Sequence, residues 1–487
     1  MKLRALIVVV LLLAGCSLAP PYSRTPGEVP QEYRFQSLQG QPRPELQTLA
    51  DLAWWEIFGD PELQHLIRTA LEQNYDVQLA AARVAEARAR VGVSRSLWLP
   101  QAGGAYAFQR QRFSEKSFPP FPATVPPTGN INQLSLDLFW EIDLFGRLRS
   151  LTQAAQAELL ASEWAQRAVL ASVVAEVAQA YFELRTLDEQ LLIAQATQKS
   201  FENSRKLVLL RFERGVVSGQ DVAQVDALVH TAGARIAALK RQIALQENRL
   251  CLLLGLNPQP VKRGKPLAEL VVRSTVPAGL PSALLERRPD IRQAEEVLKA
   301  ANHRIGAARA EFFPRITLTG LFGRQSAELA DLFTGPAKIW SIGPSVTLPI
   351  FTGGRNYFLL QDAKAKKEQA LVLYQFTVRQ AFREVADGLI GHAQLHEVRK
   401  EQEALVKSNL DYSHLANLRY KGGLESFLAV LDADRQLFAT QLDLAAAQRD
   451  QLLTLVQLYK ALGGGWETRG RPQEQAQAVP APARAGN

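Results

Sequence analysis

Apolar residues recur about every 3.6 positions over most of the chain, and this spacing predicts long amphipathic helices. Two segments, 147–211 and 355–419, each run about 64 residues without proline and with almost no glycine. Helices of that length would extend for roughly 95 Å, which favours a coiled coil or helical array over an ordinary globular core. Four shorter helices are expected at 61–98, 220–254, 281–312 and 426–462.

Elsewhere the hydrophobic period shortens to two, which predicts β-strands. In the clearest strand, 133–144, apolar residues occupy one face and mostly polar residues the other. A similar segment ends at Ile350, and weaker partners cover 101–110 and 315–323. Segments of about ten residues with one apolar and one polar face are typical of transmembrane barrel strands around an aqueous lumen.

Four strands are too few for a transmembrane barrel, because known single-chain barrels begin at about eight. Lipid leaves no backbone group unpaired, so other copies of the chain must cover the sheet edges. With four strands per chain, a dimer would give eight strands and a trimer twelve. The turns at 113–130 and 326–338 are expected to face outward. Aromatic residues near the strands are expected to lie at the membrane interface: Trp98, Trp140, Phe312, Phe313 and Trp340.

The sequence also repeats itself. "RFERGVVSGQDVAQVDA" begins at Arg211, and "RYKGGLESFLAVLDA" begins 208 residues later at Arg419. Residues 74–100 align without gaps on 288–314, which is an offset of 214. Several pairs of similar segments in the same order predict a duplicated chain.

Each repeat is expected to hold a helix, two strands, a long helix, a return helix and an equatorial segment. The first repeat covers 60–280 and the second covers 281–465. From the helix lengths, the simplest geometry stacks 220–254 end to end with 281–312. The helix at 426–462 would then stack beneath 61–98.

The N-terminus predicts an exported lipoprotein. A basic start, a short apolar run and "LAGC" ending at Cys16 resemble a bacterial lipobox, so 1–15 is read as a signal peptide and Cys16 as the lipid attachment site. Ordinary signal cleavage with an incidental cysteine is the alternative. A lipid-anchored segment is expected at 16–59 and a flexible tail at 466–487. Cys251 has no disulfide partner once Cys16 is acylated.

Composition argues for a folded transport or scaffold protein rather than an enzyme or a nucleic-acid binder. Hydrophobic residues make up 47% and charged residues 21%, and the formal net charge of +8 is interspersed along helices without basic blocks. His392 and His396 are spaced for metal binding on a helix, but no third ligand has a recognisable spacing. A solvated helix face is the preferred interpretation. We therefore expect no catalytic residues, no metal and no cofactor.

Several phrases in order resemble the TolC-like outer-membrane efflux proteins, specifically the NodT-type lipoproteins of resistance-nodulation-division systems. They include "DLAWWEIFGDPELQHLI", "LLERRPDI", "RIGAARAEFFPRITLTG", "LPIFTGGR", "RYKGGLESFLAVLDA" and "LVQLYKALGGGW". The resemblance implies a mixed α and β membrane protein that forms a homotrimer, with a twelve-stranded outer-membrane barrel and a periplasmic α-barrel of twelve helices. It also implies a periplasmic adaptor and an inner-membrane pump as partners.

The same resemblance implies a gate at the periplasmic end of the helices. Matching positions are Asp221, Tyr420 and Asp432, while Glu425 stands where the family can carry a linking arginine. Ala429 stands where a second acidic residue can occur. Gly215, Gly422 and Gly423 are expected to permit the chain reversals at the hairpin ends, and Ser426 is expected to cap the returning helix.

Two other functions stay open at this point. A lipid-tethered periplasmic coiled-coil scaffold would have no need of four strands with a lipid-facing row. Within the channel class, an exit pore for type I protein secretion is the alternative to an efflux duct. The substrate, whether drug, solvent or metal, is not specified by a tunnel of generic polar residues.

Overall fold

The computed structural model describes residues 18–39, 49–116, 126–270 and 279–466. Cys16, the predicted signal peptide and the tail after residue 466 lie outside the described residues. The described helices are α2 (Trp54–Ile57), α3 (Pro61–Gln73), α4 (Tyr75–Ser96), α5 (Arg147–Glu213), α6 (Gly219–Leu253), α7 (Leu284–Arg287), α8 (Pro289–Ala310), α9 (Arg355–Lys421) and α10 (Phe427–Ala461). The strands are β1 (Gln101–Arg112), β2 (Thr128–Ile142), β3 (Arg315–Ser326) and β4 (Lys338–Thr347).

The element boundaries confirm the duplication. α5 and α9 are each 67 residues long and begin at Arg147 and Arg355, 208 residues apart. α6 and α10 are each 35 residues long and keep the same offset. α4 and α8 are each 22 residues long, and β1 and β3 are each 12 residues long. These two pairs keep the second offset, 214.

Two of the predicted helices are interrupted. The expected helix at 61–98 breaks at Asn74, whose backbone is extended and whose side-chain Oδ1 accepts the N–H groups of Asp76 and Val77. The expected helix at 281–312 breaks at Arg288, which precedes Pro289 and is also extended. A residue before proline is disfavoured in the α conformation. Periodicity missed both breaks because each depends on one residue.

The described chain divides into two compact units, and each unit contains parts of both repeats. Unit 1 comprises Met1–Pro26, Ala82–Glu163 and Gln293–Phe376. Unit 2 comprises Gly27–Ala81, Trp164–Arg292 and Thr377–Asn487. Unit 1 therefore holds the sheet, and unit 2 holds the ends of the two helical hairpins. Within the described ranges, each helix is too short or too polar to span a bilayer.

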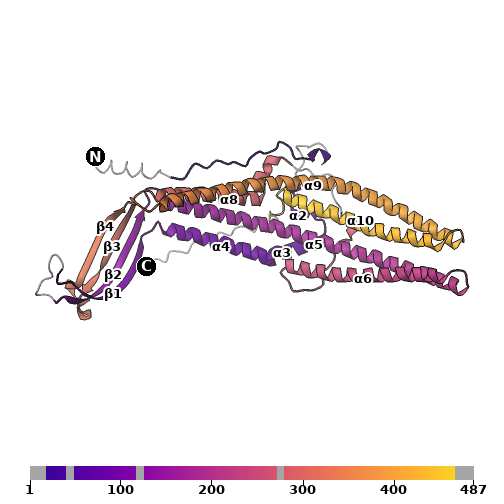
Figure 1. Cartoon of the computed structure of the whole chain (residues 1–487), viewed down its shortest axis with the longest axis horizontal. Coiled ribbons are helices and arrows are strands. Elements are labelled where there is room, and N and C mark those ends of the chain that lie inside the picture. The colour runs from indigo at the N-terminus through magenta and orange to yellow at the C-terminus, as the bar shows by residue number, and fades with distance from the viewer. Residues whose placement is uncertain (1–17, 40–48, 117–125, 271–278, 467–487) are drawn as a thin grey trace, which may run out of the picture. The chain divides into compact units, whose positions relative to one another are not determined.

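Unit 1 contains one antiparallel sheet with the strands side by side in chain order (Figure 1). The register confirms the predicted apolar face, because Leu136 pairs with Phe322 and Phe322 pairs with Trp340. Glu141 lies an odd number of positions from Leu136 and so on the opposite face, where it pairs with Thr317, which pairs with Ser345. β2 begins at Thr128 and ends at Ile142, so it starts earlier than predicted. The β2–β3 pairing joins the two repeats.

In unit 2, the helix ends meet within each repeat and not between repeats. The Asn74 amide donates to the Leu253 carbonyl at 2.8 Å, which places the end of α6 against the start of α4. At the equivalent positions of the second repeat, Arg288 Nη1 donates to the Ala461 carbonyl at 3.1 Å. Each bond satisfies one of the carbonyls that a helix C-terminus leaves without an intrahelical partner.

These two helix junctions, called joints below, are the Asn74–Leu253 and Arg288–Ala461 contacts, and they show that the predicted stacking is wrong. α6 stacks on the α3–α4 junction and α10 stacks on the start of α8, instead of α6 on α8 and α10 on α4. Helix lengths alone could not decide this, because α6 and α10 have the same length and so do α4 and α8. The specific capping bonds select the partner.

A buried polar network ties the segment between α6 and α7 that contains Gly264 and Lys265, here called the equatorial segment, to the helices of unit 2. Asp60 caps α3 by accepting the Glu62 N–H at 2.9 Å. Its other oxygen accepts the Tyr181 hydroxyl at 2.6 Å and the Lys265 N–H at 3.0 Å. The Tyr181 hydroxyl in turn accepts the Gly264 N–H at 2.9 Å. Burial and the bond to Asp60 raise the pKa of Tyr181, so the phenol stays protonated and keeps donating.

Candidate functional site

The two hairpin ends in unit 2 reverse with the same backbone bonds. In the first, Gly215 N–H donates to the Phe212 carbonyl at 2.9 Å, and its φ is +73°. In the second, Gly423 N–H donates to the Tyr420 carbonyl at 3.1 Å, and its φ is +74°. This left-handed helix end favours glycine. Gly422 lies at the turn without a positive φ, and Arg214 fills its place in the first hairpin.

We expect Gly423→Ala to destabilise the second hairpin end by about 1 kcal/mol, because alanine is strained at positive φ. Gly422→Ala is the matched control and should change stability by less than about 0.5 kcal/mol, the usual size of a surface substitution. Hydrogen exchange of the amides around residue 423 would measure both. Equal protection in the two variants would contradict this assignment of the turn.

Tyr420 lies in a buried cluster that joins the two hairpins. Its side chain is 5% exposed, and its ring packs against Phe427 with centroids 5.2 Å apart. The Arg211 guanidinium, from the first hairpin, lies 4.3 Å from the centroid of the Tyr420 ring. A cation over an aromatic face is attracted by the ring quadrupole. The Tyr420 hydroxyl has no hydrogen-bond partner among the described residues, so the link uses the ring face.

The other predicted gate residues do not gather around Tyr420. Asp221 accepts both the N–H and the hydroxyl of Ser218 at 2.9 Å, which is a local cap of α6. Glu425 pairs with Arg419 at 3.3 Å. Asp432 is exposed and accepts the Gln436 amide at 2.7 Å. Each of these carboxylates thus bonds to a neighbour on its own hairpin.

Ser426 holds the N-cap position of α10, but its side chain makes no capping bond, so the predicted cap is wrong. The two hairpins also differ in the side chain three residues after this serine. In the first hairpin, Ser218 is bonded by Asp221, whereas Ala429 occupies the equivalent position beside Ser426 and offers no acceptor.

A repeated acidic position has different partners in the two hairpins. In the first, Asp226 pairs with Arg205. In the second, the equivalent Asp434 accepts the hydroxyl of Ser413, the residue equivalent to Arg205, at 2.5 Å. Burial raises the pKa of Asp434, although bonds from Ser413 and Asn417 partly oppose this. Between α9 and α10, Asp434 therefore relies on neutral donors where its counterpart has a cation.

We expect Asp434→Asn to stabilise the second hairpin at neutral pH by less than about 1 kcal/mol, since water still screens this site. Because the folded pKa is raised, the folded chain holds the Asp434 proton to higher pH than the unfolded chain, and wild-type stability falls as pH rises through that range. The gain should disappear below the ordinary carboxyl pKa. Hydrogen exchange of variant and wild type, compared at each pH, would detect it, and a pH-independent difference would contradict it.

Sequence reasoning missed Arg211 and Phe427, which both pack against the Tyr420 ring. A signal was present, because Arg211 opens the first of the two repeated phrases and is matched by Arg419. His392 was expected on a solvated face, and this is wrong because its side chain is buried. The described residues contain no group of three potential metal ligands.

The predicted interface aromatics of unit 1 fall into two groups. The Trp140 indole donates to the Trp98 carbonyl at 2.8 Å, and the Trp98 indole donates to Thr152 at 3.0 Å. Phe312 and Phe313 end the segment before β3, and the Phe313 ring stacks on Phe145 at 4.8 Å. Trp340 instead lies near the start of β4, beside Phe322. Trp98, Trp140, Phe312 and Phe313 therefore lie at or beyond one end of the strands, whereas Trp340 lies within the apolar face.

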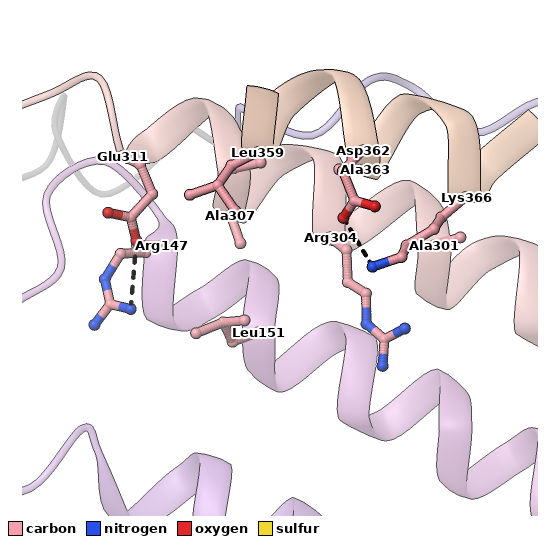
Figure 2. Close-up of a pocket in the computed structure, with 11 residues that line it drawn as sticks. Arg147, Leu151, Ala301, Arg304, Ala307, Glu311, Leu359, Asp362, Ala363 and Lys366 are labelled. Atoms are coloured by element: carbon pink, nitrogen blue, oxygen red, sulfur yellow. Dashed lines mark hydrogen bonds and ion pairs between the residues drawn. The ribbon is translucent and has the colours of Figure 1, made fainter. Parts of the chain in front are cut away.

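An open groove of about 470 Å³ in unit 1 lies between the first turns of α5 and α9 and the last turns of α8 (Figure 2). Its cations have carboxylate partners: Arg147 bonds Glu141 at 2.7 Å, Arg304 pairs with Glu158, and Lys366 bonds Asp362 at 2.8 Å. Glu311 also lines the groove and lies 4.0 Å from Arg147, and the remaining lining side chains are leucine and alanine. A groove whose charges are compensated in this way offers no single charge for selective capture of an ion.

The segment that follows Cys16 is bound along α8 within unit 1. Arg309 donates to the Leu18 carbonyl at 3.0 Å, and Asn302 donates to the Pro20 carbonyl at 2.7 Å. A Cβ at Gly306 would lie 2.8 Å from the Ala19 nitrogen, so only glycine admits this approach. Arg24 further along pairs with buried Glu295 at 2.9 Å.

The chain is similar to outer membrane components of efflux pumps and to a solved outer membrane channel. The toluene efflux pump outer membrane protein TtgF of Pseudomonas putida is 40% identical over 473 residues, 95% of this chain and 96% of that protein. The antibiotic efflux pump outer membrane protein ArpC of Pseudomonas putida is 38% identical over 483 residues, 98% of each chain. The open state of the Neisseria gonorrhoeae MtrE outer membrane channel superposes with a TM-score of 0.81 at 33% identity, covering 93% of this chain and 99% of that one.

The family model for outer membrane efflux proteins matches twice, over residues 66–256 and 280–464. The two matches begin 214 residues apart and end 208 residues apart, which are the offsets of the internal repeat. The chain therefore belongs to the outer membrane efflux protein family.

Proposed function

We propose that this protein is the passive exit duct of a tripartite efflux pump, in which three copies form a twelve-stranded barrel and a helical tunnel. The observation that carries this proposal is the four-stranded sheet, in which β2, β3 and β4 carry apolar residues or glycine on one face from the row of Leu136 to the row of Ile142. Within the described residues β1 and β4 each pair on one side only. Lipid tolerates no open sheet edge, so neighbouring copies must pair with both edges.

The substrates are proposed to be small apolar or amphipathic molecules. The names of the relatives support this class, since TtgF is described as a toluene pump component and ArpC as an antibiotic pump component. The compensated charges in the unit 1 groove also fit passage without selective binding. An inner-membrane pump of the resistance-nodulation-division class and a periplasmic adaptor would supply the energy and the substrate choice.

Lipid anchoring at Cys16 is part of the proposal. Leu18, two residues after it, is held by Arg309 in the last turn of α8, close to the point where β3 begins at Arg315. An acyl chain on Cys16 would then lie near the membrane-facing strands. Two attachments, lipid and barrel, would hold the same end of the chain in the outer membrane.

Complementation would test this function. The full chain, expressed with candidate adaptor and pump pairs in a strain that lacks its own outer membrane channel, should restore tolerance to solvent or antibiotic. An empty vector is the control. Restored secretion of a protein substrate without restored tolerance would favour the type I secretion pore, and a monomer in detergent would contradict a channel of either kind.

Asp432 is proposed to contribute to the closed gate through its exposed carboxylate. We expect Asp432→Ala to raise the conductance of the closed channel in planar bilayers, roughly two- to fivefold if one weak contact near the opening is lost. Gln436→Ala is the matched control, since Gln436 is the bonding partner of Asp432 on the same helix. Conductance unchanged by Asp432→Ala would contradict a gating role for this residue.

A further inference from the structure

The two hairpin ends are built from one repeated sequence, but only one of them is covered within the chain. Tyr420 and Phe427 of the second hairpin are each 5% exposed, and Arg211 of the first hairpin lies over the Tyr420 ring. Phe212 occupies the position of Tyr420 in the first hairpin and is 47% exposed. Arg419, the counterpart of Arg211, is also largely exposed. The contact between Arg211 and Tyr420 is therefore formed within the chain, whereas the equivalent residues Arg419 and Phe212 are exposed.

We propose that a second copy of this chain completes the repeat, with Arg419 of one copy lying over the Phe212 ring of the next copy. This inference rests on the proposed trimer. In a ring of alternating first and second hairpins, each second hairpin meets the first hairpin of the neighbouring copy. The duplication makes that contact equivalent to the one between the two hairpins of a single chain.

The chemistry of the exposed residues fits this occupant. Arg419 uses Nε to bond Glu425 at 3.3 Å, and this leaves the planar face of the guanidinium available for a ring. Phe212 has no hydroxyl, so covering its ring buries no side-chain polar group. Leu207 packs against the buried cluster within the chain, whereas its counterpart Leu415 is 56% exposed. The same neighbouring copy would cover Leu415.

The contact between copies would also be smaller than the contact within a chain. Gly219 stands at the position of Phe427, and Ala223 stands at the position of Leu431. Phe427 and Leu431 are both buried in the cluster, so the interface between copies lacks two large apolar side chains. When the hairpins separate, the interface between copies therefore parts first.

Cross-linking of the full chain would test the pairing. Phe212→Cys combined with Arg419→Cys, treated with a short bis-maleimide in detergent, should give dimers and trimers on denaturing gels. Arg211→Cys with Tyr420→Cys should link within one chain and leave the mass of a monomer. Lys240→Cys with Arg419→Cys is the distance control, because Lys240 lies 21 residues along α6 from Gly219, roughly 30 Å away. The wild type controls for Cys251, which is buried.

The outcomes separate this inference from the proposed function. An intact trimer by light scattering, with the Phe212→Cys and Arg419→Cys pair linked only at monomer mass, would overturn the pairing and leave the duct in place. The pairing would be overturned in the same way if the Lys240→Cys control linked as efficiently. A protein that is monomeric in detergent would overturn both. Efficient links between copies from the Phe212 pair alone would support the inference.

Conductance gives a second test that does not depend on cysteine chemistry. Phe212→Ala and Arg419→Ala should each raise closed-state conductance roughly two- to fivefold, as expected for loss of one exposed cation–π contact. The double variant should raise it no further, because both changes remove the same contact. Multiplicative effects would overturn the pairing.

Grafting the missing side chain tests the weaker interface. A Cβ at Gly219 would lie 3.8 Å from Phe212 Cε2, an ordinary contact distance, so a larger side chain can be placed there. Gly219→Phe should lower closed-state conductance and oppose opening, since it restores the partner that Tyr420 has in Phe427. Raised conductance in this variant would contradict the inference.

Discussion

Replacing Arg288 by alanine is expected to lower the free energy of unfolding of unit 2 by about 2–4 kcal/mol. The Arg288 side chain is only 8% exposed, and it bonds Asp290 at 2.6 Å and Glu384 at 2.8 Å. It also donates to the Ala461 carbonyl at the end of α10. Its loss leaves two carboxylates without their cation and a helix end without its donor. The expected loss in free energy of unfolding is smaller than for a fully buried ion pair, because both carboxylates keep about a third of their surface in water.

Asn74→Ala is the matched control, because Asn74 holds the equivalent joint in the first repeat with neutral bonds only. It should cost about 1–2 kcal/mol, the range for a lost helix cap and hydrogen bond. Denaturant titration of the helical circular dichroism in detergent would compare the two variants. If Asn74→Ala proved as costly as Arg288→Ala, the charge-based explanation of the second joint would be wrong.

The long helices and the duplication were predictable because the sequence pattern that indicates each one extends over many residues. A period of 3.6 over α5 and α9, and an offset of 208 between them, do not depend on any single side chain. The apolar face of the sheet was predictable for the same reason, since a one-residue slip in register would exchange the two faces. The register pairs Leu136, Phe322 and Trp340 as that pattern requires.

The joints between helices were not predictable, because each depends on one long-range bond. The bond from Asn74 to Leu253 joins residues 179 positions apart, and helix lengths fit either stacking partner equally well. Arg288 and Ala461 occupy the positions of Asn74 and Leu253 in the second repeat, and they form the second joint. A local pattern therefore predicted the elements, and tertiary bonds selected their neighbours.

At the hairpin ends, too, local features were predictable from sequence and long-range contacts were not. Gly215 and Gly423 were identified from sequence because a positive φ restricts the residue type. Tyr420 was named through family resemblance, but its contact with Arg211 came only from the structure. The second hairpin also lacks the carboxylate that bonds Ser218 in the first, because Ala429 stands where the first hairpin has Asp221. Comparing the two repeats residue by residue would have indicated this loss.

Asp60→Ala is expected to have the other large effect, a loss of about 3–5 kcal/mol in the free energy of unfolding of unit 2. Asp60 is 1% exposed, and its carboxylate accepts three donors. Without it, the Glu62 and Lys265 N–H groups and the Tyr181 hydroxyl lose an acceptor in a buried site, and each such loss costs about 1–3 kcal/mol. The equatorial segment that contains Gly264 and Lys265 would then detach from α3 and α5.

Tyr181→Phe is the control for this network, because it removes one donor to Asp60 and leaves the cap of α3 in place. It should cost about 1–2 kcal/mol. Trypsin offers a local measurement, since Lys262, Arg263 and Lys265 lie within the segment that Asp60 holds. Cleavage there should become fast in Asp60→Ala and stay slow in Tyr181→Phe. Rapid cleavage in Tyr181→Phe as well would mean that the tyrosine, rather than the carboxylate, is what holds the segment against the helices.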